Sequence, residues 1–186
     1  MIVFGCCGSF CTLARGLCEM EQLVAAGHTV QPIFSEIVQT TDTRFGTAAD
    51  FRRRAEELCG RPLITTIRDA EPIGPRLKAD LMIVAPCTGN TLAKIAHGIT
   101  DSVMTMAIKA HLRNERPLIL ALATNDGLGA NLENVGRMLV RRNVYFVPFG
   151  QDDPVGKPRS LIAHFPLLAD TIEAALRGEQ LQPILQ

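Results

Sequence analysis

Several short segments of this chain are continuously apolar, and this pattern restricts the folds that the chain can adopt. Leu81–Ala85 reads LMIVA and Pro117–Ala123 reads PLILALA, without the polar alternation of a half-exposed strand. Strands of this kind are buried on both faces, as in a parallel sheet covered by helices. Amphipathic segments at helical spacing separate the strands, for example at Cys11–Ala26 and Thr47–Cys59. The chain is therefore predicted to be an α/β protein, a three-layer α/β/α Rossmann-like sandwich.

Six parallel strands are expected, in the order that right-handed crossovers produce in a doubly wound sheet. Numbered along the chain, they are Met1–Phe4, Thr29–Phe34, Pro62–Ile67, Leu81–Ala85, Pro117–Ala123 and Val144–Val147. Their expected order across the sheet is 3-2-1-4-5-6. Further helices are expected at Leu132–Arg142 and Pro166–Arg177. The 186 residues contain no linker, repeat or low-complexity segment, so residues 1–186 are expected to form one domain.

The charge and hydropathy of the chain argue against two classes of partner. Lysine plus arginine and aspartate plus glutamate number 19 each, whereas nucleic-acid-binding domains normally carry a basic excess. No apolar run approaches the ~20 residues that a membrane-spanning helix needs. The expectation is a soluble, cytoplasmic protein that binds neither nucleic acid nor a membrane.

Six cysteines raise the question of disulfides or a metal site. They are Cys6, Cys7, Cys11, Cys18, Cys59 and Cys87. No CxxC pair is present, no histidine lies near the first four, and there is no secretory signal. These thiols are therefore expected to be small buried side chains, and no metal site is predicted.

Glycines and polar residues follow four of the predicted strands, at the ends that share one edge of a parallel sheet. They are Gly8 and Ser9 after the first strand, Ser35 after the second, Thr88–Thr91 after the fourth and Asn125 after the fifth. Backbone N–H groups at helix N-termini, together with hydroxyls, suit a phosphate group. Ser9, Thr12, Asn90 or Thr91 could instead cap a helix. The coincidence of four such ends favours a nucleotide or flavin phosphate site.

A dinucleotide site is the alternative at this edge. The first turn, Gly5-Cys6-Cys7-Gly8, lacks the GxGxxG fingerprint. Glu36 follows the second strand, where an acidic residue binds a ribose hydroxyl in NAD sites. From the residues alone, NAD(P) binding through Glu36 stays open.

The same strand ends carry recognisable motifs. Gly8-Ser9, Ser35 and Pro86–Thr91 occupy the places of a Gly-Ser turn, a serine and a Pro-x-Ser/Thr-x-Asn-Thr motif, and Ala93–Asp101 matches Ala-Lys-x-Ala-x-Gly-Ile-x-Asp. In these features the chain resembles the flavoprotein family of homo-oligomeric flavin-containing cysteine decarboxylases, which includes phosphopantothenoylcysteine decarboxylase and flavin prenyltransferase. The family's Pro-Ala-Met-Asn motif is represented by Leu122–Asn125, which keeps only the Ala and the Asn. The decarboxylases' active-site histidine has no evident counterpart.

This resemblance implies a bound FMN and a homo-oligomer, a trimer or larger. The implied cofactor-binding residues are Gly8, Ser9, Phe10, Ser35, Thr88, Gly89, Asn90, Thr91 and Ala123. Asn125 is the implied catalytic residue, beside the isoalloxazine ring. Arg44 and Lys109 are candidates for binding the carboxylates of an acidic substrate.

Longer segments are similar to one branch of the family, the flavoprotein subunits of a two-subunit synthase in sporulating bacteria. These segments are Val38–Gly46, Ala70–Pro75, Leu122–Gly129, Tyr145–Asp152 and Gln180–Pro183. The similarity implies that a dihydro precursor is oxidised to the small diacid pyridine-2,6-dicarboxylate in the mother cell. It also implies an A subunit with its own NADP-binding domain. A stand-alone flavin-dependent decarboxylase of a cysteine-like acid and a non-catalytic scaffolding subunit are the alternatives.

Overall fold

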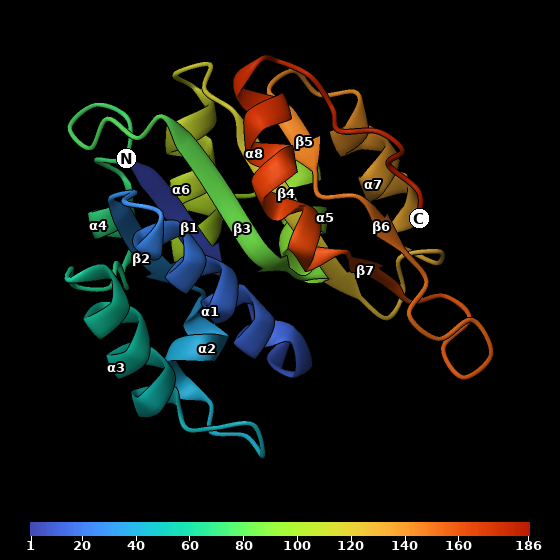
Figure 1. The fold of residues 1–186 in the computed structure, drawn as a ribbon, viewed down its shortest axis with the longest axis horizontal. Helices are drawn as coiled ribbons and strands as arrows, with labels where there is room; N and C mark the ends of the chain where they lie inside the picture. The colour runs from blue at the N-terminus through green and yellow to red at the C-terminus, as the bar shows by residue number, and fades with distance from the viewer.

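Five parallel strands form the centre of the sheet in the computed structural model, which describes residues 1–186 (Figure 1). In spatial order they are β2 (Val30–Phe34), β1 (Ile2–Cys6), β3 (Leu81–Cys87), β4 (Leu118–Thr124) and β5 (Val144–Phe146). The predicted α/β class and the predicted order of these five strands are confirmed.

The two edges of the sheet differ from the prediction of six parallel strands. At one edge, Pro62–Ile67 forms no strand: Ile64 alone bridges to Ile33, and the short helix α4 (Ile67–Ala70) follows. Near the other edge, β6 (Phe149–Gly150) and β7 (Leu161–Ala163) are antiparallel, and β7 pairs with the end of β4. The sheet therefore has seven strands and is mixed. Strands of two and three residues are too short to show a period of two in the sequence.

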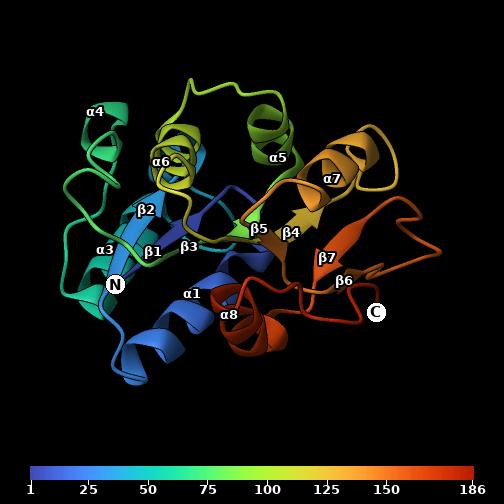
Figure 2. The ribbon, with the colours of Figure 1, turned by 90° about the horizontal axis from the view of Figure 1, so that it is seen from above.

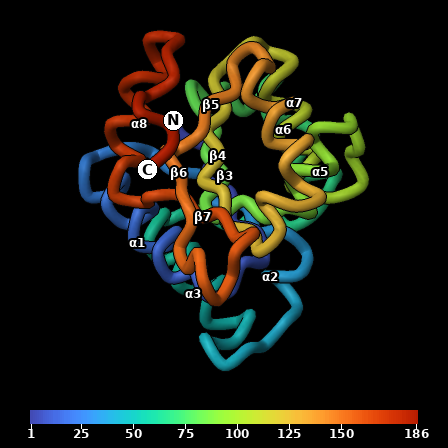
Figure 3. Tube along the Cα trace, turned by 90° about the vertical axis from the view of Figure 1, so that its right-hand side faces the viewer, coloured from blue at the N-terminus to red at the C-terminus, as the bar shows by residue number.

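Helices cover both faces of the sheet, as Figures 2 and 3 show from two directions. One layer contains α1 (Phe10–Ala25), α3 (Ala48–Cys59) and α8 (Leu168–Leu176), and the other contains α5 (Gly89–Ala96), α6 (Val103–Leu112) and α7 (Leu132–Leu139). Alternate strand residues enter two hydrophobic clusters: Phe4 packs in the cluster of α1, and Val84 in the cluster of α6. Both faces of each central strand are thus buried, which explains the uninterrupted apolar runs.

Several element boundaries differ from those expected. The short helix α2 (Glu36–Thr40) was not anticipated, α7 ends at Leu139, and the last helix begins as a 3₁₀ turn at Phe165–Leu167. The longest helix is α1, and none is both long and apolar enough to cross a bilayer.

Pro86 lies inside β3, whereas it was expected to end the strand. The carbonyl of Pro86 still accepts a hydrogen bond from the Cys7 N–H at 3.0 Å, although proline has no N–H to donate. The register with β4 shifts between Val84 and Cys87, which accommodates the missing donor. The strand consequently extends to Cys87 and delivers Thr88 directly to the edge of the sheet.

Gly16 allows α1 to pack unusually close to β3. A Cβ at this position would collide with the carbonyl oxygen of Ala85 and would lie 2.9 Å from Cδ of Pro86. Since both contacts involve the backbone or a rigid ring, the helix cannot keep this position with any larger residue. The contact fixes the N-terminal end of α1 relative to the end of β3.

The six cysteines are all free and range from buried to exposed, with Cys59 half-buried. Cys6, Cys7 and Cys87 are buried, as predicted, whereas Cys11 and Cys18 are exposed on α1. The prediction of uniformly buried thiols is therefore wrong for α1, whose outward face carries these two residues. No cluster of three or more His, Cys, Asp or Glu side chains is arranged to hold a metal ion.

Candidate functional site

Two adjoining cavities lie along the carboxyl edge of the central strands. The first, of about 320 Å³, lies between the start of α1 and the end of β4, and we call it the β4 cavity. The second, of about 510 Å³, lies over the end of β2, and we call it the β2 cavity. Gly8 and Thr88 line both, so the two cavities adjoin, and we call them together the groove.

The predicted cofactor-binding residues all line this groove. The β4 cavity is lined by Gly8, Ser9, Phe10, Thr88, Gly89, Ala123 and Asn125, and the β2 cavity by Gly8, Ser35, Thr88, Asn90 and Thr91, with further residues in each. Their common location follows from the parallel sheet, because the carboxyl ends of its strands share one edge. Their role toward a cofactor stays a prediction.

Ser9 and Ser35 both precede helices, but neither side chain caps its helix. Ser9 Oγ accepts a hydrogen bond from Thr12 at 2.8 Å, and its own proton has only the Cys11 sulfur, 3.9 Å away. Ser35 Oγ is buried and has no hydrogen-bond partner at all. An unpaired buried hydroxyl costs roughly 1–3 kcal/mol, so such groups normally mark a missing partner. The local capping explanation therefore fails for Ser9 and Ser35.

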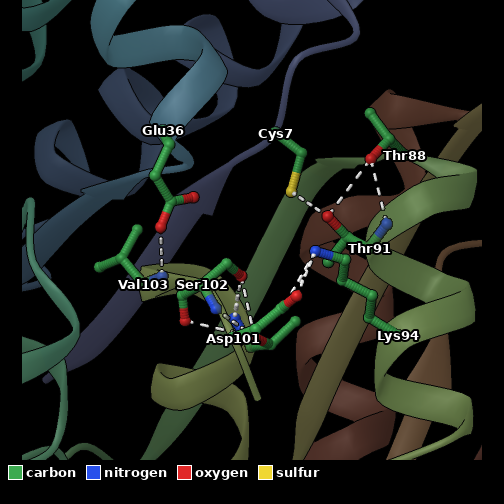
Figure 4. A network of polar contacts seen from close by, with 9 residues as sticks. Cys7, Glu36, Thr88, Thr91, Lys94, Asp101, Ser102 and Val103 are labelled. Carbon is green, nitrogen blue, oxygen red and sulfur yellow. Dashed lines mark hydrogen bonds and ion pairs between the residues drawn. The ribbon is translucent and has the colours of Figure 1, made fainter. Parts of the chain in front are cut away.

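Thr88 is a true N-cap, because its hydroxyl accepts from the Thr91 N–H at 3.4 Å. The Thr91 hydroxyl is engaged within the protein: it accepts from Thr88 and donates to Cys7 Sγ, each at 3.3 Å (Figure 4). Burial raises the pKa of the Cys7 thiol to about 11, so this sulfur is a neutral acceptor. These bonds tie the start of α5 to β1.

The first two N–H groups of α5, those of Gly89 and Asn90, have no acceptor within the protein. A Cβ at Gly89 would lie 2.5 Å from Asn131 Nδ2 and 2.6 Å from Thr124 Oγ1, so the turn is closed on that side. The Asn90 side chain is exposed and makes no hydrogen bond. The free N–H groups of Gly89 and Asn90 and the Asn90 amide thus line the groove at the N-terminus of α5, where the helix dipole favours an anion.

Glu36, the residue of the dinucleotide alternative, has a structural role at the start of α6. Its Oε1 accepts a hydrogen bond of 2.6 Å from the N–H of Val103, the first residue of α6 (Figure 4). A carboxylate in this position also stabilises the dipole of α6. This bond occupies Oε1 only, and Oε2 of the exposed Glu36 side chain has no partner in the β2 cavity, so NAD(P) binding through Glu36 stays open.

A hydrogen-bond network that the sequence analysis missed organises the turn after β4. Asp126 accepts from the Thr124 hydroxyl and, at 2.9 Å for each oxygen, from Asn131 Nδ2. The bonds from Thr124 and then Asn131 hold the pKa of Asp126 below its usual value. Asn125 lies between these residues, exposed and without a side-chain hydrogen bond. The network thus holds the turn that carries Asn125, and the Asn125 amide is free in the β4 cavity.

The loop between β6 and β7 also reaches the β4 cavity, and sequence analysis missed this as well. Asp152, Lys157 and Ser160 line the cavity together with Asn125. The pairing of Thr124 with Leu161 brings the loop there. No sequence signal identified this contact, because two very short antiparallel strands produce it.

The two predicted substrate-binding cations, Arg44 and Lys109, line neither the β4 cavity nor the β2 cavity. Arg44 is on an exposed turn, with its guanidinium 4.9 Å from the centre of the Phe45 ring. Lys109 lines a separate cavity of about 310 Å³ between α5 and α6, together with Arg113 and Arg141. Lys157 is the one cation that lines the β4 cavity together with Asn125.

Known proteins resemble this chain over most of its length. The family model described as Flavoprotein matches residues 1–148. The B subunit of dipicolinate synthase from Bacillus subtilis (strain 168) is 47% identical over 184 residues, which cover 99% of this chain and 92% of that protein. The crystal structure of the B subunit of dipicolinate synthase from Bacillus halodurans has a TM-score of 0.91 at 44% identity and covers 100% of this chain and 95% of that one. The FMN-dependent cysteine decarboxylase SpaF shares the fold, with a TM-score of 0.68 at 20% identity over 95% of each chain.

Proposed function

The chain belongs to the flavoprotein family, and from that premise we propose that it is the FMN-binding subunit of a dipicolinate synthase. The observation that carries the proposal is the buried, unpartnered hydroxyl of Ser35, in the same cavity as Asn90 and the N-terminus of α5. This donor set fits a phosphate monoester. The high identity to the B subunit of the Bacillus subtilis dipicolinate synthase, over nearly the whole chain, supports the choice of reaction.

The FMN phosphate would bind at the centre of the groove. Ser9 and Ser35 supply hydroxyl donors from the ends of β1 and β2, and Gly89 and Asn90 supply backbone N–H groups. All four donors are uncommitted within the protein, and none is a cation. Recognition would therefore depend on directed hydrogen bonds and on the dipole of α5.

The isoalloxazine ring would lie in the β4 cavity, near the small side chain of Ala123 and the amide of Asn125. When bound, FMN would supply the redox chemistry, which is the removal of two electrons and two protons from a dihydropyridine ring. The part of Asn125 would be to orient the ring dicarboxylate by hydrogen bonds. Asp126 would hold the turn that carries Asn125, since its carboxylate accepts hydrogen bonds from Thr124 and Asn131.

The proposed enzyme is an oxidoreductase of two different subunits. The partner would be an A subunit with its own NADP-binding domain, and several copies of this chain would assemble, as trimers or larger. The substrate would be a small diacid, in the mother cell of a sporulating bacterium. Neither cavity contains a histidine, so nothing at the site favours a stand-alone cysteine decarboxylase.

The absorption spectrum of the purified protein tests the proposal. We expect visible flavin bands, or saturable binding of added FMN with quenching of flavin fluorescence. Ser9→Ala, which removes one of the four donors proposed for the phosphate, should weaken FMN binding about tenfold, as expected for one hydrogen bond to a charged group. Arg53→Ala, a change on the exposed face of α3, is the matched control. A colourless protein that neither binds FMN nor gains thermal stability from it contradicts the proposal and favours a scaffolding subunit.

Thiol alkylation gives a second expected result. Cys11 and Cys18 should react with iodoacetamide in the native protein, whereas buried Cys6, Cys7 and Cys87 should not. Because Cys11 lines the β4 cavity and Cys18 does not, FMN should slow the modification of Cys11 alone. Peptide mapping by mass spectrometry measures both rates, and Cys18 is the internal control. Equal rates of Cys11 modification with and without FMN would place the flavin away from α1.

A further inference from the structure

The β4 cavity contains one cation and one carboxylate, and both come from the loop between β6 and β7. Lys157 Nζ lies 3.3 Å from Asp152 Oδ2. Ser160, from the same loop, and then Lys157 hold the pKa of Asp152 below its usual value, so the Asp152 side chain is an anion at neutral pH. The ion pair and Asn125 line the same cavity.

The backbone around Lys157 is well fixed. The Lys157 N–H donates to Asp153 O at 2.8 Å, its carbonyl accepts from the Ser160 N–H at 3.0 Å, and Gly156 N–H donates to Asp153 Oδ1 at 2.8 Å. Gln151 Nε2 closes the base of the loop through Pro158 O at 2.8 Å. The attachment point of the Lys157 side chain is thus held in place without help from its ammonium group.

The ammonium group, in contrast, is held weakly. The Lys157 side chain is 52% exposed and Asp152 is 29% exposed, and Asp152 is the single carboxylate that pairs with this lysine. Exposed ion pairs contribute little to stability, because water solvates both partners. Lys157 can therefore exchange Asp152 for another carboxylate at small cost.

We propose that Lys157 binds a carboxylate of the substrate, and that Asp152 occupies its ammonium group until the dicarboxylate arrives. This inference deepens the proposed function and rests on it for the identity of the ligand. A planar ring dicarboxylate between Asn125 and Lys157 would have an amide donor at one end and a cation at the other. The carboxylate of Asp152 competes with the ligand carboxylate for the Lys157 ammonium group, and this competition lowers the affinity for the ligand.

Opposite effects of two substitutions test the proposal. The measurement is calorimetric titration of the FMN-loaded chain with pyridine-2,6-dicarboxylate. Lys157→Met should weaken binding about tenfold or more, since a charge-assisted hydrogen bond is lost. Asp152→Asn should tighten binding about two- to fivefold, the effect of removing an exposed competing charge. The double variant should bind as weakly as Lys157→Met, because Asp152 acts only through Lys157.

Control variants separate the possible outcomes. Lys78→Met removes an exposed lysine outside both cavities and should leave the affinity unchanged. The inference is overturned if Lys157→Met binds normally, if Asp152→Asn weakens binding, or if the FMN-loaded chain binds no dicarboxylate. Loss of binding in Lys109→Met but not in Lys157→Met would assign the diacid to the cavity between α5 and α6. The FMN absorbance of each variant is recorded before the titration. A protein that fails to bind FMN contradicts the proposed function, whereas an FMN-loaded protein that fails to bind the dicarboxylate contradicts the role of Lys157.

Discussion

Ser35→Ala should make the ligand-free protein more stable and, in the same variant, weaken FMN binding. The Ser35 hydroxyl is buried without a partner, so its removal relieves a desolvation penalty of roughly 1–3 kcal/mol. A gain of 1 kcal/mol corresponds to about 2–4 °C in Tm for a chain of this length. The loss of a hydrogen bond to a charged phosphate costs about 1.5–3 kcal/mol, which weakens FMN binding roughly 10- to 150-fold. Few substitutions are expected to raise the stability of the ligand-free protein and at the same time lower its affinity for FMN.

Thermal unfolding without FMN and fluorescence titration with FMN measure the two effects of Ser35→Ala. Ser102→Ala is a useful contrast for stability, because Ser102 caps α6 by accepting from the Thr105 N–H at 3.1 Å. Loss of that cap should destabilise the protein by about 1 kcal/mol. A destabilised Ser35→Ala protein would show that Ser35 is bonded in the free state. Unchanged FMN affinity would show that the phosphate lies elsewhere.

The centre of the sheet could be predicted from the sequence because its strands are buried on both faces, and burial on both faces leaves a continuous apolar run. The irregular edge at Pro62–Ile67 could not be predicted from the sequence. Gln31 Nε2 donates to the Pro62 carbonyl at 2.8 Å, and Gln39 Nε2 donates to the Thr65 carbonyl at 3.2 Å. Side chains thus satisfy the groups that a sixth parallel strand would have paired. The apolar pattern of a segment does not reveal such competition.

The grouping of Gly8, Ser35, Thr88 and Asn125 was predictable because it depends only on strand order. What each hydroxyl does was not predictable. Thr88 caps its helix and Ser35 does not, although both precede a helix at a strand end. The backbone angles of the two residues are nearly the same (φ −78°, ψ 157° for Thr88 and φ −64°, ψ 156° for Ser35), so the backbone at the cap does not distinguish them. Lys157 was missed for another reason, because antiparallel strands of two and three residues bring it to the site.

Gly16→Ala should destabilise the protein, whereas Gly136→Ala should stabilise it. Both glycines lie within helices, α1 and α7, where alanine is intrinsically better by roughly 0.5–1 kcal/mol. Nothing lies within 4 Å of a Cβ at Gly136, so that gain should be realised in full. At Gly16 the methyl group collides with Ala85 O and Pro86, and overpacking of this kind costs about 1–3 kcal/mol.

The two glycine variants also differ in what they do to the site. Relief of the Gly16 collision requires α1 to move away from β3, and this movement separates Ser9 from Thr88, which line the same cavity. FMN affinity should therefore fall in Gly16→Ala and stay unchanged in Gly136→Ala, as measured by titration beside urea denaturation of each variant. Reduced stability with normal affinity would mean that the strain is relieved at the C-terminal half of α1. Reduced affinity with normal stability would mean that the close approach of α1 and β3 serves the cofactor site and is not needed for the fold.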